Sequence, residues 1–139
     1  MNWASNYPTS LEKISILQKR IMRLISFSGY RAPSLPVFRK LKVLNLQQIC
    51  SFQTGIFMYK YCAGMLPSVF NDIFIFNREV HSHYTRQSNF FHYFAFNLNV
   101  AKFSIRSVGP KLWNTIPTYL KDLSFYPFKK QYKQLLLNS

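Results

Sequence analysis

The sequence predicts a mainly α-helical domain with one short antiparallel β-hairpin. Helices are predicted because apolar residues recur at helical spacing in residues 11–27 and 124–137, and because residues 46–63 are apolar on nearly all sides. The hairpin is predicted because residues 90–97 and 101–106 read as strands around an Asn-Leu-Asn turn. The 139 residues make up one domain's length and suffice to bury a core.

We expect a single domain over residues 1–139, with a helical part at about 10–74 and the hairpin and closing helices at about 83–137. Thr9 or Ser10 caps the first helix, residues 11–27. Gly29 is its expected C-cap. A short helix follows at about 37–42. The first helix is amphipathic, with an apolar arc (Leu11, Ile14, Leu17, Ile21, Met22, Leu24, Ile25) opposite a basic one (Lys13, Lys19, Arg20, Arg23).

Residues 46–63 form the expected central helix, whose aromatic side chains we assign to the core. Gly55 is expected to permit close packing against this helix, and Gly64 and Pro67 end it. A short helix at 67–74 and a loop at 77–83 follow.

Residues 104–117 are predicted as a strand that turns at Gly109-Pro110 into a short helix anchored by Trp113. Pro117 ends that helix, and a short helical piece reaches Asp122. Ser124 caps the closing helix, which has an apolar face (Phe128, Tyr132, Leu135, Leu136) and a basic one (Lys129, Lys130, Lys133).

The charge balance is strongly basic, with 18 Lys+Arg against 4 Asp+Glu and a formal net charge of +14. Such a chain repels itself and attracts a polyanion, and nucleic acid fits this best. The alternative is a basic protein kept in solution by its charge, or a piece whose acidic partner domain is missing. Disorder is excluded, because 48% of the residues are hydrophobic.

Several short sequence motifs occur in an order that carries a family resemblance. They are Leu17-Gln18-Lys19-Arg20, Gly55 to Tyr61 with Leu66-Pro67, Thr85 to Asn89, Ser104-Ile105-Arg106, Gly109 to Asn114 with Pro117, and Phe128-Lys129-Lys130. From Trp3 to Leu137 the chain resembles the C-terminal end of the reverse-transcriptase polyproteins of non-LTR (LINE-type) retrotransposons. The resemblance implies an RNA-directed DNA polymerase fragment that continues upstream of Met1.

Catalysis by this chain is not expected. The resemblance implies that the carboxylates that hold the two catalytic metal ions of the polymerase lie in a Tyr-x-Asp-Asp motif of its palm domain. This sequence has no such motif, and Glu12, Asp72, Glu79 and Asp122 are scattered. The chain therefore resembles the thumb-side region after the palm.

No metal or other cofactor is expected either. The candidate ligands Cys50, Cys62, His81, His83 and His92 lack the spacing of a zinc site. The two cysteines are interpreted as free, buried thiols in a reducing compartment. Some relatives carry a Cys-Cys-His-Cys knuckle downstream, and this chain lacks it.

The predicted partner is RNA or DNA, bound by cations that neutralise template phosphates: Lys19, Arg20, Arg23, Arg39, Lys40, Arg86, Lys102 and Arg106. Two alternatives stay open: the basic face of the first helix is simply solvated, or Arg86 bridges a flexible polar arm at 83–89 to Asp72 or a helix end. We interpret Trp113 as a core anchor rather than a base-stacking platform.

The upstream palm domain is a second possible partner. No membrane partner is expected, because no apolar run approaches about 18 residues, and no small-molecule substrate is expected. The resemblance implies an intracellular location, in the nucleus or cytoplasm. The alternative function is a structural packing module, marked by a large exposed apolar surface on the helix at 46–63 or on the hairpin, or a decayed transposon remnant without activity.

Overall fold

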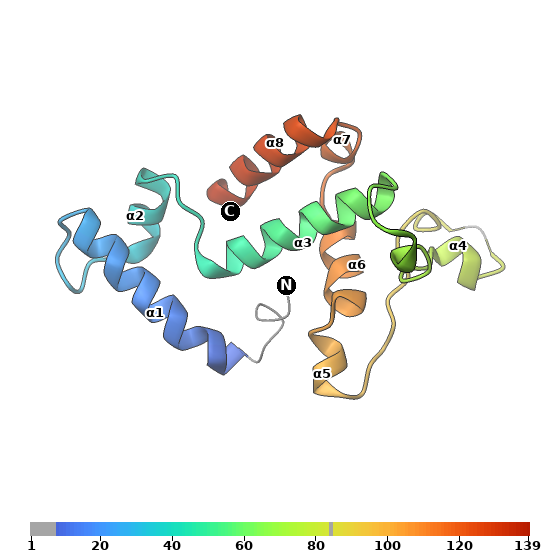
Figure 1. The fold of residues 1–139 in the computed structure, drawn as a ribbon, viewed down its shortest axis with the longest axis horizontal. Coiled ribbons are helices and arrows are strands. Elements are labelled where there is room, and N and C mark those ends of the chain that lie inside the picture. The colour runs from blue at the N-terminus through green and yellow to red at the C-terminus, as the bar shows by residue number, and fades with distance from the viewer. Residues whose placement is uncertain (1–7, 84) are drawn as a thin grey trace.

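The computed structural model describes residues 8–83 and 85–139 and is mainly helical, as predicted. Figure 1 shows the helices arranged around α3, with α1 and α2 at one end and α4 at the other. The elements in chain order are α1 (Pro8–Ile25), α2 (Ser34–Lys40), α3 (Leu46–Cys62), a 3₁₀ turn η2 (Ser68–Phe70), α4 (Asn77–Val80), α5 (Asn99–Lys102), α6 (Ile105–Thr115), α7 (Thr118–Lys121) and α8 (Phe125–Asn138).

The main core lies where α3 packs against α6 and α8. Tyr59 of α3 stacks on Phe128 of α8 at a ring separation of 4.5 Å and meets Trp113 of α6 edge-on at 6.5 Å. Trp113 is buried, in agreement with its interpretation as an anchor. The Tyr59 hydroxyl donates to the Leu123 carbonyl at 2.7 Å, so the phenol is satisfied inside the core.

Two glycines let the helices of this core approach closely. A Cβ on Gly55 of α3 would overlap the ring of Tyr132 of α8, which confirms the expected close packing there. A Cβ on Gly109 of α6 would lie 2.7 Å from the Met58 sulfur of α3. At its start, α3 carries a capping box: the Asn45 side chain accepts from the Gln48 N–H at 2.9 Å, and the Gln48 side chain accepts from the Asn45 N–H at 3.0 Å.

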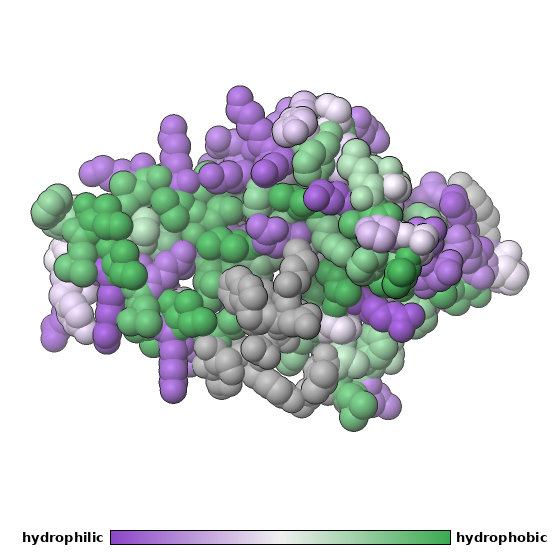
Figure 2. Space-filling view, in the orientation of Figure 1, coloured by the Kyte–Doolittle hydropathy of each residue, from purple (hydrophilic) through white to green (hydrophobic). Residues whose placement is uncertain are grey.

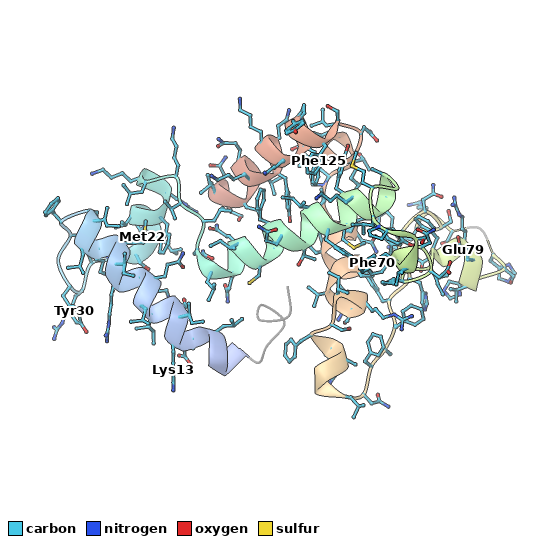
Figure 3. All side chains as sticks on the ribbon, viewed as in Figure 1. Lys13, Met22, Tyr30, Phe70, Glu79 and Phe125 are labelled. Carbon is cyan, nitrogen blue, oxygen red and sulfur yellow. The ribbon has the colours of Figure 1, made fainter. Side chains whose placement is uncertain are left out.

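A second, smaller core joins α1 to α2 through Met22, Val37 and Phe38. Figure 3 shows Met22 pointing from α1 toward α2, whereas Lys13 points away. Gln18 attaches α1 to the start of α3, because its side-chain amide donates to the Leu44 carbonyl at 3.1 Å and accepts from the Leu46 N–H at 2.9 Å. This amide and the burial of Met22 together set how α1 is rotated against the rest of the protein.

The ends of α1, α2 and α3 share one hydrogen-bond pattern, the Schellman motif, in which a residue just past the helix adopts a left-handed conformation. That residue is Phe27 (φ 51°) after α1, Lys42 (φ 53°) after α2 and Gly64 (φ 65°) after α3. After α1, the Ser28 N–H donates to the Arg23 carbonyl at 2.9 Å. Gly29 was thus the wrong C-cap, since the helix ends earlier and Phe27 takes the left-handed position.

The predicted hairpin was wrong. Residues 101–106 lie in α5 and the start of α6, and residues 90–97 form no strand beyond an isolated antiparallel bridge between Phe76 and Phe91. The physical reason lies in the partners of Phe91: its N–H donates to the Asn114 side chain at 3.2 Å, and its carbonyl accepts from the same amide at 3.0 Å. These bonds replace those of a partner strand, and the Phe91 ring stacks on Phe76 at 4.5 Å.

The expected turn at Gly109-Pro110 is also absent, because α6 runs through both residues. Pro110 supplies no N–H to the Arg106 carbonyl and costs α6 one internal hydrogen bond. Burial of Pro110 and the contact of Gly109 with Met58 offset that cost. Two shorter segments differ as well: residues 67–74 contain only the 3₁₀ turn η2, and the expected loop at 77–83 begins with α4.

Candidate nucleic-acid interface

The eight cations predicted as nucleic-acid contacts are spread over the molecule. Lys19, Arg20 and Arg23 lie on α1, Arg39 and Lys40 on α2, Arg86 in the turn after α4, Lys102 on α5 and Arg106 on α6. In Figure 1 these elements occupy both ends and the lower edge of the molecule. All eight are exposed except Arg23, which is half-buried. The structure therefore does not bring the predicted set together as one surface.

Two members of the set make hydrogen bonds within the fold. The Arg23 Nε donates to the Ala32 carbonyl at 2.8 Å and holds the loop between α1 and α2. The Arg39 Nη2 donates to the Ser139 carbonyl at 3.3 Å and links α2 to the C-terminus. Arg23 thus has a structural role, whereas Arg39 keeps an exposed guanidinium with donors to spare.

The segment at 85–90 is a hydrogen-bonded turn, which corrects its interpretation as a flexible arm. The Asn77 side chain donates to the Gln87 carbonyl at 3.0 Å, and the Arg78 N–H donates to the Ser88 carbonyl at 3.0 Å. Ser88 is buried. Arg86 is exposed at this turn, which α4 holds in place.

A further cationic group lies on α8 and at the end of α2. We call it the α2–α8 edge and define it as Arg39, Lys40, Lys42, Lys129, Lys130 and Lys133, all exposed. The three lysines of α8 fall within an arc of about 100° on the helix. Four members, namely Lys42, Lys129, Lys130 and Lys133, were not among the predicted contacts, although the basic face of the closing helix was visible in the sequence.

Contacts at the end of α8 make this edge continuous. Leu137, which shares the arc of the α8 lysines, is buried beside Leu35, Phe38 and Arg39 of α2 in a small pocket of about 70 Å³. At 1.5 Å per residue, Lys133 and Lys129 lie roughly 9 and 15 Å along the helix from Ser139, which accepts from Arg39. Figure 2 shows hydrophilic residues along the upper edge of the molecule, over α2 and α8.

Aromatic side chains near the cations fall into two groups. Tyr126 is exposed on the same arc of α8 as the three lysines, where a base could stack on it. Lys121 instead lies over the rings of Trp113 and Phe90, at 5.3 and 5.9 Å. Burial lowers the pKa of Lys121, and the nearby Cys62 and Asp122 oppose that shift. Lys121 therefore belongs to the core boundary, whereas Tyr126 is exposed on the arc of the α8 lysines.

The cysteines and histidines form no metal-binding group among the described residues. The His81 and His92 rings lie 5.6 Å apart, and the His92 Nδ1 is 3.2 Å from the Asn77 side-chain oxygen. Both cysteines are free, and Cys50 has the smaller exposed fraction; desolvation raises the pKa of both thiols, that of Cys62 to about 11. The expectation of two buried thiols is wrong for Cys62, which is exposed at the last residue of α3.

No helix within residues 8–83 and 85–139 combines the length and the apolar character needed to cross a membrane. Comparison of the chain with protein-family models, curated proteins and solved structures gave no match.

Proposed function

We propose that this chain binds the phosphate backbone of RNA or DNA through the α2–α8 edge, as a non-catalytic C-terminal fragment of a non-LTR retrotransposon RNA-directed DNA polymerase. The observation that carries the proposal is the cluster of six exposed cations on two adjoining elements. Four carboxylates cannot neutralise 18 Lys and Arg side chains, so most of the positive charge of the chain is uncompensated, and this edge carries six of these cations.

The mechanism is electrostatic and positional. Each lysine that neutralises a phosphate releases condensed counterions, and this release favours binding in a salt-dependent way. Contacts of this kind hold a strand without reading its sequence. On this proposal the edge holds template RNA or target DNA for a palm domain elsewhere in the polyprotein, in the nucleus or the cytoplasm.

Several residues of the motifs that carry the resemblance have structural roles in this fold. Gln18 joins α1 to α3, Gly55 receives the Tyr132 ring, Gly109 contacts Met58 and Asn114 binds the Phe91 backbone. Each occupies a position where its residue type is needed for packing or hydrogen bonding.

The test is RNA binding by the full chain at several salt concentrations, measured by fluorescence anisotropy. Replacing Lys129, Lys130 and Lys133 by Gln should weaken binding and reduce the magnitude of the slope of log affinity against log salt by about 2. The matched control replaces Lys13, Lys19 and Arg20 of α1 by Gln, which removes the same charge from another surface. An equal effect of both triple variants would mean that binding depends on net charge alone and would overturn the assignment to this edge.

The second candidate function is a packing module. A packing module was expected to expose an apolar surface on the helix at 46–63 or on the hairpin. In the structure the large apolar residues of α3 are buried or half-buried. Exposed apolar side chains gather on α1 instead. A contact with another protein is therefore favoured there, and it is independent of nucleic-acid binding by the α2–α8 edge.

A further inference from the structure

Helix α1 exposes most of its apolar arc to solvent. Five side chains form this surface, which we call the α1 strip, with exposed fractions from 47% for Ile14 to 75% for Leu24: Ile14, Leu17, Ile21, Leu24 and Ile25. Figure 2 shows hydrophobic residues over α1 and the loop at its C-terminal end.

The strip is exposed because of how α1 is rotated. At about 100° per residue, Gln18 and Met22 lie within about 40° of each other, and both face the protein. The strip lies on the next part of the arc, where nothing from α2 or α3 covers it fully. The apolar arc is thus wider than the contact that α2 and α3 supply.

The spacing within the strip matches the seam of a two-stranded coiled coil. Ile14, Leu17, Ile21 and Leu24 follow steps of three, four and three, with Ile at the positions called a and Leu at those called d. Such a narrow seam accepts the knobs of one partner helix. From Ile14 to Leu24 it spans about 15 Å and contains the a and d positions of two successive heptads.

Charge defines the partner. Lys13 and Arg20 are exposed along the outer border of the strip, at the g positions of the same heptads. A helix with Glu or Asp beside its apolar seam would pair with them. A second copy fits poorly, because it brings only four carboxylates and a further net charge of +14.

We propose that the α1 strip is a docking surface for an amphipathic helix of another protein whose apolar seam is flanked by acidic residues. Docking covers Leu17 and Ile21 at the centre of the strip and places the acidic flank of the partner beside Lys13 and Arg20.

The probe is a synthetic three-heptad peptide with Ile at a, Leu at d and Glu at e and g, whose own charges disfavour self-association. Binding to the full chain is measured by fluorescence anisotropy. We expect the double variant Leu17→Gln/Ile21→Gln to bind at least tenfold more weakly. Ile16→Gln, which changes a 42%-exposed residue outside the strip, should bind as the unmodified chain does. Leu24→Gln serves as a second variant, and circular dichroism checks that each variant stays helical.

Two control peptides separate the apolar and charge contributions. Binding should fall at least tenfold when Glu is replaced by Lys at e and g, and likewise when Gln replaces Ile and Leu at a and d. Equal binding of the Glu and Lys peptides would overturn the acidic partner. Concentration-dependent dimerisation through Leu17 and Ile21 would assign the strip to a second copy. Binding of anionic lipid vesicles through those residues, without peptide binding, would assign it to a membrane surface. Either outcome overturns the proposal.

Discussion

Replacement of Gly55 by Ala should destabilise the fold, although Ala is the better helix former. The change gains about 1 kcal/mol of helix propensity at a mid-helix position. Against this, the new Cβ would lie 2.8 Å from the Tyr132 Cζ and 3.0 Å from its hydroxyl oxygen. Tyr132 cannot easily yield, because it is buried between Phe52 and Phe128, with ring separations of 6.0 and 5.4 Å.

The expected size follows from two costs. Overpacking costs about 1–3 kcal/mol. A displaced ring also weakens the hydrogen bond from the Tyr132 hydroxyl to the Ser51 carbonyl, 3.1 Å long, which contributes about 1 kcal/mol. After the gain in helix propensity is subtracted, the net loss in the free energy of unfolding should be about 1–3 kcal/mol, or a Tm lower by roughly 3–12 °C.

Chemical denaturation followed by circular dichroism measures this loss. Gly29→Ala is the matched control, because no heavy atom lies within 4 Å of a Cβ there, and its effect should stay within about 0.5 kcal/mol. In a Tyr132→Leu background, Gly55→Ala should become neutral or stabilising, since the overlapping ring atoms are gone. If Gly55→Ala left the original chain as stable as before, the close crossing of α3 and α8 at this point would be refuted.

Three further predictions concern other contacts. Phe27→Gly should stabilise the chain by about 1 kcal/mol, because Phe27 is 97% exposed and its left-handed backbone disfavours a side chain. Thermal unfolding should show this as a higher Tm, and a lower Tm would contradict it. Burial raises the pKa of Tyr132 to about 12 from 10.0, so the stability it contributes should be complete below pH 10 and fall as pH rises through 12. In alkaline denaturation Tyr132→Phe should flatten that decline, and an unchanged profile would argue against it. Asn114→Ala should lower the free energy of unfolding by about 2 kcal/mol in denaturant unfolding, because both hydrogen bonds to Phe91 are lost. Thr115→Ala, at an exposed neighbour, is the control. Equal losses in both variants would count against the role of Asn114.

Helical periodicity predicted the long helices well. The expected helix at 46–63 is α3, Leu46–Cys62, and the closing helix is α8, whose predicted face includes the buried Phe128, Tyr132 and Leu136. In these segments the apolar residues repeat with the period of the helix, so the buried face can be predicted without knowing its neighbours in the fold. The prediction of strands at residues 90–106 failed. It rested on alternating apolar residues, and such residues can be buried by ring stacking without a partner strand.

The sequence predicted a cationic surface for nucleic acid, but it did not place that surface on α2 and α8, where we propose it. Net charge follows from the composition alone. Helical spacing predicts a basic face on α8 and on α1 equally well. Which basic segments adjoin depends on contacts between distant residues, such as Arg39 with Ser139. That α2 and α8 share an edge was therefore invisible in the sequence.

The sequence by itself determined the helical class, the central helix with its close-packed Gly55, and an excess of positive charge that four carboxylates cannot cancel. These follow from local periodicity, residue size and counting. Only contacts in the folded chain make α6 continue through Pro110, turn most of the apolar arc of α1 to solvent and bring α2 and α8 together as one basic edge. The physical reason is that each depends on partners far apart in the chain, such as Gln18 with Leu46 and Gly109 with Met58, whose contacts outweigh local preference.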